Sequence, residues 1–331
     1  MYTDANVPAH GRTDVLDKTI GEFRVAITFF FVLSGFLLVQ PWLRGKAPDL
    51  GRFAIRRIAR VGPAYWAALI GSLLILTGTG HGREIALHDT WKFVLFVSNL
   101  FPETRTMLDP PMWSMHVEMS FYVVLPLIGL ALLRAGKHRL LICASLVAAS
   151  VAFTTAGTFG AWKPEATETL PTYLGAFAFG IAAACIAPRV KHAPAVLAAG
   201  IALVVGNGVW HSGGTGQLGH AIADLPAELG FAAIIWALAA KPARILERAP
   251  LRSIGTVSFG LYLWHMPVMF ALQIHDRMPE RFLPAMLWIA PITAALAIAS
   301  WYLIEKPAIA LSGRPRRQRA PAGQLATRYS R

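Results

Sequence analysis

A carboxylate within an apolar stretch is the first group in this sequence that could do chemistry. Glu118 lies in WSMHVEMSFYVVLP, residues 113–126, just inside the start of a run long enough to cross a bilayer. A charge in hydrocarbon costs at least about 2.5 kcal/mol, so Glu118 is a candidate functional residue. On a helix, Ser114, Glu118 and Tyr122 would share one face, whereas His116 would point elsewhere. A hydrogen-bonded or protonated Glu118 that only holds its helix in place would give the same pattern.

A ridge of arginines precedes one of the apolar runs. In RRIARVGPAY, residues 56–65, Arg56 and Arg60 are four residues apart and Arg57 is adjacent, with Tyr65 following into the membrane. Such a ridge can bind phosphates through forked, charge-assisted hydrogen bonds. Basic loops on the cytoplasmic side are also common for reasons of membrane topology alone, so both interpretations stay open.

Two further ionisable groups lie in or near apolar runs. His265 follows Tyr262 in FGLYLWHMPV, residues 259–268, and a neutral imidazole is the usual general base in enzymes. It could equally be a hydrogen-bonded structural histidine. Glu305 ends the last apolar run, and we interpret it mainly as an interfacial carboxylate at a helix terminus, with contact to a bound ligand as the alternative.

The elements that must position these residues are membrane helices. The chain has 331 residues, of which 55% are hydrophobic and only 15% charged, too little polar surface for a soluble globule of this size. We predict an all-α, polytopic helix bundle with about nine transmembrane helices and expect a shorter interfacial or re-entrant segment over residues 91–101. The predicted spans cover residues 25–42, 61–78, 117–133, 139–156, 170–187, 193–210, 225–240, 254–273 and 284–304.

The positive charge follows the loops of this topology. One alternating set of loops holds 22 of the 31 lysines and arginines, so the positive-inside rule places that set and the carboxyl terminus in the cytoplasm. We expect residues 1–24 to be extracytoplasmic, residues 25–311 to form the transmembrane domain and residues 312–331 to be a disordered basic tail. Because topology accounts for the net charge of +13, we expect no nucleic-acid partner.

Metal and disulfide chemistry are not indicated. Cys143 and Cys185 lie in separate apolar segments without metal-ligand spacing. The Gly-rich stretch HSGGTGQLGH contains His211 and His220, but a nine-residue spacing in such a loop is nonspecific. We therefore expect no metal site and no bound cofactor.

Five stretches in order resemble the membrane-bound acyltransferase 3 family. They are FFFVLSGFLL (29–38), RRIARVGPAY (56–65), WSMHVEMSFYVVLP (113–126), FGLYLWHMPV (259–268) and LIEKP (303–307). Each motif alone is weak, but together they cover nearly the whole chain. The resemblance implies an integral membrane O-acyltransferase of a bacterial plasma membrane that moves an acetyl or other short acyl group from cytoplasmic acyl-CoA. The acceptor would be a hydroxyl of a carbohydrate, a glycolipid or a secreted molecule.

Together with the positions of these side chains on their helices, the resemblance suggests roles for individual residues. Catalysis is expected of Glu118 and His265. Donor binding is expected of Arg56, Arg57, Arg60 and Tyr65. The substrate chamber is expected to include Trp113, Ser114, Tyr122 and Tyr262.

The sequence departs from the family pattern at its beginning. Members typically have ten spans, and the first carries an Arg followed eleven residues later by a His, regarded as the catalytic pair. No span precedes Phe29 here, and His10 lies in a polar stretch. We expect that the sequence lacks a first helix of the family pattern. A natural short form, either inactive or using His265 as base, is the alternative.

Two other functions fit a polytopic protein with buried polar groups. A transporter or flippase of a lipid-linked sugar would move its substrate without consuming acyl-CoA. A noncatalytic scaffold would depend on its basic tail and would tolerate substitution of Glu118 and His265. The order of the five motifs favours acyl transfer over both.

Overall fold

The structure is a computed structural model. It describes residues 26–76, 87–104, 108, 112–186, 192–212, 222, 224–241, 244–279 and 282–313, and every regular element in these ranges is helical. The predicted segment 1–24 and nearly all of the predicted tail lie outside the described residues. The main helices are α2 (Ala26–Leu38), α3 (Gln40–Leu43), α4 (Leu50–Leu76), α5 (Thr90–Val94), α6 (Trp113–Ala135), α7 (Arg139–Phe159), α8 (Pro164–Thr167), α9 (Leu170–Ile186), α10 (Ala193–Ser212), α12 (Leu225–Ala240), α13 (Ala249–Ile274), α14 (Phe282–Ser300) and α15 (Lys306–Ser312).

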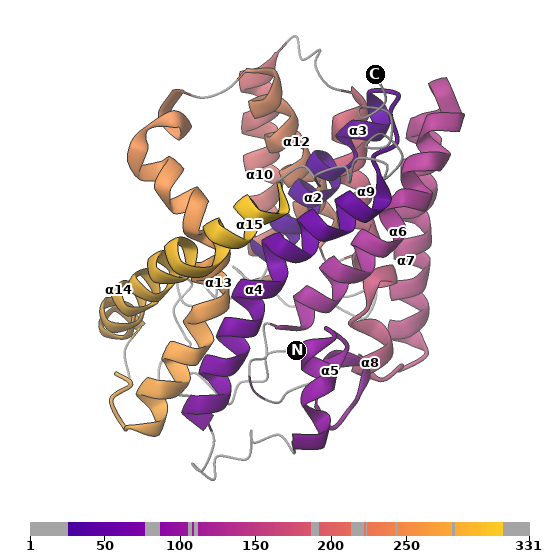
Figure 1. The fold of residues 1–331 in the computed structure, drawn as a ribbon. Coiled ribbons are helices and arrows are strands. Elements are labelled where there is room, and N and C mark those ends of the chain that lie inside the picture. The colour runs from indigo at the N-terminus through magenta and orange to yellow at the C-terminus, as the bar shows by residue number, and fades with distance from the viewer. Residues whose placement is uncertain are drawn as a thin grey trace, which may run out of the picture.

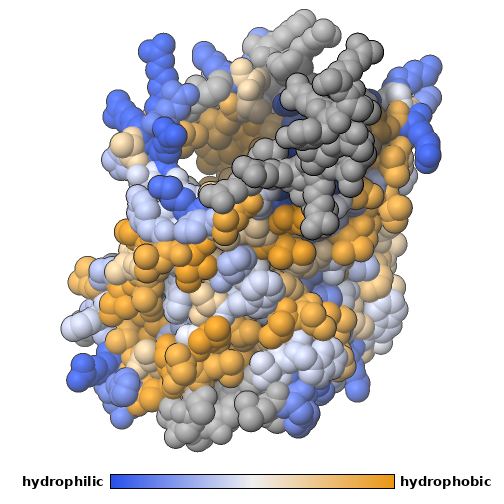
Figure 2. All heavy atoms as spheres, in the orientation of Figure 1, coloured by the Kyte–Doolittle hydropathy of each residue, from blue (hydrophilic) through white to orange (hydrophobic). Residues whose placement is uncertain are grey.

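The helices have the length and composition of membrane spans. Within the described ranges, six are long and apolar enough to cross a membrane, and the longest of these runs through α6 and α7. Ile27–Leu43 and Leu225–Ala240 are shorter apolar helices. Figure 2 shows mostly hydrophobic side chains around the middle of the molecule and hydrophilic ones toward its two ends. The all-helical membrane fold is confirmed, while nine crossings and a cytoplasmic carboxyl terminus stay predictions.

Helix α4 continues through the arginine ridge. It begins at Leu50 and runs unbroken past the internal Pro63 to Leu76. Asp49 accepts a hydrogen bond from the backbone N–H of Arg52 at 2.7 Å, which satisfies one of the unpaired donors at the helix start. At about 1.5 Å per residue the helix is about 40 Å long, so its first turns carry the arginines beyond its apolar part.

The helices form two groups, and Figure 1 shows α6 and α7 of the first group on the right and α13 and α14 of the second on the left. In the first group, α2, α6, α7, α9 and α12 share one hydrophobic cluster, and α10 packs on α12. In the second group, α13 packs against α4 and α14, and α15 packs against α4. The clusters of the two groups are built from different residues, so the bundle has a seam between them.

Helix α6 contributes to both groups and therefore forms part of the seam. Its Val117, Phe121 and Leu125 belong to the cluster of the first group. Met115, on another face, belongs to the cluster that contains α4 and α13. A helix that buries two faces in different neighbours leaves a third face between them, and Glu118 lies on that face.

The segment around α5 is fastened by an ion cluster outside the predicted spans. Lys92 Nζ lies 2.8 Å from Asp89 Oδ1 and also pairs with Glu103. Hydrogen bonds from Lys92 lower the pKa of both carboxyls below their usual values. Their contribution to stability is therefore present above the ordinary carboxyl pKa range and is lost as the pH falls through the lowered values. Tyr65 and Trp66 of α4 donate hydrogen bonds to backbone oxygens of this segment, and His116 of α6 contacts another, so residues 91–101 are docked on these two helices. The interfacial or re-entrant position expected for them stays a prediction.

Candidate functional site

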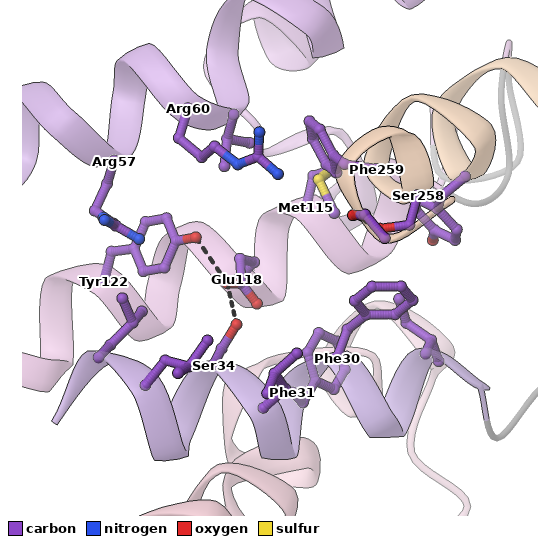
Figure 3. Close-up of a pocket in the computed structure, with 17 residues that line it drawn as sticks. Phe30, Phe31, Ser34, Arg57, Arg60, Met115, Glu118, Tyr122, Ser258 and Phe259 are labelled. Atoms are coloured by element: carbon purple, nitrogen blue, oxygen red, sulfur yellow. Dashed lines mark hydrogen bonds between the residues drawn. The ribbon is translucent and has the colours of Figure 1, made fainter. Parts of the chain in front are cut away.

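A cavity of about 280 Å³ lies in the seam between the two helix groups. Helices α2 and α6 supply its walls on one side, and α4 and α13 supply them on the other. Figure 3 shows the side chains that converge on it from these four helices. Among its lining residues are Phe30, Phe31, Ser34, Arg57, Arg60, Met115, Glu118, Tyr122, Ser258 and Phe259.

Glu118 is the acidic group of this cavity and is only 7% exposed. Ser34 and Tyr122 each donate a hydroxyl hydrogen bond of 2.7 Å to its Oε1 atom, as the dashed lines in Figure 3 show. Both bonds use the same oxygen, and no side chain in the described part of the chain donates a hydrogen bond to Oε2, so this oxygen can interact with a molecule in the cavity. Two hydroxyl donors fix the rotamer of the carboxylate.

Two close helix contacts set the direction of these groups. Gly35 in α2 and Gly180 in α9 touch the backbone of the facing helix so closely that an added Cβ would lie 2.2 Å from Phe177 O and 1.9 Å from Val32 O, respectively. With Gly35 against α9, the neighbouring Ser34 faces the cavity. On α6, Phe121 stacks on Phe177 with ring centroids 3.8 Å apart, which turns Glu118 toward Ser34.

The arginine ridge faces two adjoining cavities. Arg57 and Arg60 line the cavity with Glu118, and Figure 3 shows both projecting from α4. A second cavity of about 380 Å³ is lined by Arg52, Arg56 and Arg57 near the start of α4. Leu37, Leu38 and Arg57 line both cavities, which therefore meet at these side chains. Arg57 Nε is buried without a hydrogen-bond partner in the described structure, so this donor can take an anionic ligand.

Glu305 is buried in the protein within a continuing helix, so the prediction of a helix terminus is wrong, while its interfacial depth in the membrane stays a prediction. The carboxylate is 0% exposed and lies in a π-helical turn, Trp301–Glu305, between α14 and α15. Arg60 Nη1 lies 3.3 Å from Glu305 Oε2 in an ion pair. The sequence motif suggested a helix terminus, but α15 continues the chain as helix and packs this turn against α4.

The substrate-chamber residues predicted on α6 and α13 lie around this cavity. Tyr122 and Tyr262 line it directly. Ser114 is fully buried and shares a 2.7 Å hydrogen bond with the hydroxyl of Tyr262. Trp113 packs against Tyr173 and against Phe31, with ring centroids 4.9 and 6.3 Å apart, and Phe31 lines the cavity. All four residues therefore line the cavity or contact a residue that lines it.

Two predicted site residues lie apart from the lining. His265 is not among the lining residues, and its Nδ1 lies 2.6 Å from the carbonyl oxygen of Tyr262 on its own helix. Tyr65 is buried, donates a 2.9 Å hydrogen bond to Phe93 O and packs its ring on Phe96. This position makes Tyr65 the contact that attaches the α5 segment to α4. The roles predicted for these two residues stay predictions.

The structure adds two residues that we did not select from the sequence. Ser34 is a hydroxyl within the apolar motif FFFVLSGFLL, and only the crossing of α2 over α9 shows that it faces Glu118. Ser258 lines the cavity from α13. A small polar residue in an apolar run was the available signal, but serines are common in membrane helices and the signal is weak.

Comparison with known proteins identifies the family of this chain. A family profile described as an acyltransferase domain matches residues 6–305. The chain belongs to the acyltransferase 3 family. It is therefore a multi-pass membrane protein and an acyltransferase, as the order of its motifs predicted.

Several curated relatives are similar over most of the chain. Nodulation protein 10 of Rhizobium leguminosarum bv. viciae is 28% identical, with 92% of this chain and 86% of the relative covered. Acyltransferase MdmB of Streptomyces mycarofaciens is 27% identical, with 90% of this chain and 83% of the relative covered. The peptidoglycan O-acetyltransferase OatA of Listeria monocytogenes is 25% identical over 74% of this chain and 44% of that protein. No solved structure matches the chain.

Proposed function

We propose that this acyltransferase moves a short acyl group, such as acetyl, from cytoplasmic acyl-CoA to a hydroxyl of a carbohydrate, glycolipid or secreted acceptor. One observation carries the proposal. The buried carboxylate of Glu118 and the arginines of α4 line a single cavity, and that cavity joins a second one lined by more arginines. Along the two adjoining cavities, the arginines would bind an anion, the shared walls would form a passage, and Glu118 would supply a reactive carboxylate.

The donor would enter from the start of α4. The phosphates of CoA would bind Arg56 and Arg57, because guanidinium groups form forked hydrogen bonds to phosphate oxygens. The pantetheine arm would then pass Leu37 and Leu38 into the cavity beside Glu118. The mostly apolar walls around Phe30, Phe31 and Phe259 suit an uncharged acyl group, and the volume of about 280 Å³ favours a short one.

The transfer itself needs a base and a site for negative charge. The acceptor hydroxyl oxygen attacks the thioester carbon, forming the new C–O bond and placing the electron pair of the carbonyl on its oxygen. The electron pair on this oxygen then re-forms the C=O bond as the C–S bond breaks, and the thiolate of CoA leaves. The hydroxyl proton passes to Glu118 and then to this thiolate, so the products are an ester and free CoA. We assign the base to Glu118 rather than to His265 because Glu118 lines the cavity.

The acceptor class rests on the relatives. The name of OatA describes acetyl transfer to the oxygen of peptidoglycan, a carbohydrate-containing polymer of the cell envelope. A hydroxyl acceptor also fits a cavity whose polar walls include Ser34, Tyr122 and Tyr262. These hydroxyl groups can orient a sugar by exchanging hydrogen bonds with it.

Binding of acyl-CoA by the purified protein in nanodiscs tests the donor assignment. We expect Arg57→Ala to weaken the affinity for acetyl-CoA about tenfold or more, since a charge-assisted hydrogen bond contributes about 1.5–3 kcal/mol. Arg44→Ala is the matched control, because Arg44 is exposed near the same end and lines neither cavity. Equal affinities of Arg57→Ala and the wild type would contradict the assignment.

A further inference from the structure

Arg60 is held differently from the other arginines of the ridge. Arg52 and Arg56 are exposed, whereas the Arg60 side chain is 34% exposed and paired with the fully buried Glu305. Its guanidinium carbon lies 5.5 Å from the centre of the Trp301 ring and 5.9 Å from that of Phe259. An ion pair and two aromatic rings therefore restrict the Arg60 side chain at the wall of the cavity.

Glu305 reaches Arg60 because of the π-helical turn. The turn Trp301–Glu305 adds a residue to the helix path, and its Tyr302 and Leu303 face outward, being 59% and 76% exposed. Glu305 faces inward, and Ser300 also donates a hydrogen bond of 3.4 Å to its Oε1 atom. Such π-turns are rare and occur often at functional sites. A buried carboxylate also needs a cation, and among the described residues Arg60 is its ion-pair partner.

We propose that Glu305 is a positioning residue that holds the Arg60 guanidinium at the reaction cavity, where Arg60 stabilises the oxyanion of the acyl-thioester. This inference depends on the proposed function and divides the ridge between two tasks. Arg56 and Arg57 bind the phosphates, and Arg60 acts on the reacting carbonyl. A guanidinium has five N–H donors, so the bond to Glu305 leaves others for the cavity.

The physical reason is preorganisation. When the acceptor oxygen bonds to the thioester carbon, the carbonyl oxygen gains a negative charge that disappears as the C–S bond breaks. A donor already fixed in place stabilises this charge without paying for its own reorganisation. A long arginine side chain without Glu305 would sample several rotamers, and its guanidinium would also lose the carboxylate that orients its plane.

Glu305→Gln tests the inference through the split between turnover and binding. We expect acyl-CoA turnover to fall about tenfold or more, while the affinity for acyl-CoA stays within about twofold of the wild type. Leu303→Ala in the same turn is the matched control and should turn over at the wild-type rate. A Glu305→Gln protein with unchanged turnover, or with weakened acyl-CoA binding as its only defect, would overturn the inference.

A charge exchange separates positioning from simple structural support. The double variant Arg60→Glu/Glu305→Arg re-forms an ion pair between α4 and the π-turn, but it takes the cation away from the cavity wall. We expect the double variant to regain the thermal stability lost by Arg60→Glu alone, yet to remain at least about tenfold below wild-type turnover. Recovery of both stability and turnover would show a merely structural pair.

Failure of the proposed function would look different. A wild-type protein that binds acyl-CoA but releases no CoA thiol in the presence of any hydroxyl acceptor would contradict the proposed reaction, and this inference with it. Wild-type thiol release together with full activity of Glu305→Gln would overturn only the role of Glu305.

Discussion

The chemistry at residue scale depends on how one carboxylate is held. Glu118 provides the carboxylate in the wall of the cavity that the described residues form. Ser34 comes from α2 and Tyr122 from the same helix as Glu118, so the two donors fix the carboxylate from two helices. This arrangement predicts different costs for losing the proposed base, Glu118, and for losing one of its two hydroxyl donors.

Glu118→Gln should reduce acyl transfer about a hundredfold or more, since a general base contributes about 10²–10⁴-fold and an amide cannot accept the proton. Ser34→Ala should cost about tenfold at most, because Tyr122 still orients the carboxylate. Thiol release from acyl-CoA measures both, and exposed Glu247→Gln is the control. Normal activity of Glu118→Gln would assign Glu118 a structural role. If His265→Ala loses activity while Glu118→Gln keeps it, His265 is the base.

At the scale of elements, the packing of α2 on α9 determines where Ser34 points. The two helices approach through Gly35 and Gly180, and neither position has room for a Cβ against the facing backbone. The contact between facing backbones cannot relax by rotating a side chain, so it fixes the position of α2, and with it the cavity wall, against α9.

Gly180→Ala should therefore destabilise the protein by about 1–3 kcal/mol, the usual cost of overpacking, and should lower activity by moving α2. Gly206→Ala in α10 is the matched control, because nothing lies within 4 Å of the added Cβ. The melting temperatures and turnover of the two variants in detergent check this expectation. Equal stability of Gly180→Ala and Gly206→Ala would mean that α2 and α9 do not cross as described.

At the scale of the whole molecule, the seam between two helix groups forms the site. Each group has its own hydrophobic cluster, and the cavity takes walls from both. Ligand sites often lie between such packing units, because each unit can bury its own core while polar groups remain between them. The seam also joins the arginine-lined cavity to the cavity with Glu118, so the proposed donor would enter from one side of the membrane.

That direction can be measured by labelling single cysteines with a membrane-impermeant maleimide after Cys143 and Cys185 are replaced by alanine. Glu247 and Lys163 are exposed on loops that the charge pattern places on opposite sides. We expect Lys163→Cys to react in intact cells and Glu247→Cys to react only after permeabilisation. The reverse result would place the arginine ridge outside and would exclude entry of cytoplasmic acyl-CoA at the start of α4.

The sequence by itself determined the helical membrane class, the family and much of the cavity. A continuous apolar run has to form a helix in lipid, because the backbone can satisfy its hydrogen bonds there without water. The spacing of Ser114, Glu118 and Tyr122 also fixes their common face, since helical periodicity is a local property. The arginine ridge followed from the same periodicity and is helical, as α4 shows.

Only the tertiary structure decided which faces meet. Helices that are apolar nearly all round carry no periodic signal for their partners, so the contact of Ser34 with Glu118 had no clear trace in the sequence. The motif LIEKP suggested a carboxylate at a helix terminus, yet Glu305 is buried within a continuing helix against Arg60, which lies 245 positions earlier in the chain. Pairing over such a distance depends on how α4 packs against α15 and the π-turn, and this packing arises from the shapes of whole helices rather than from any local pattern.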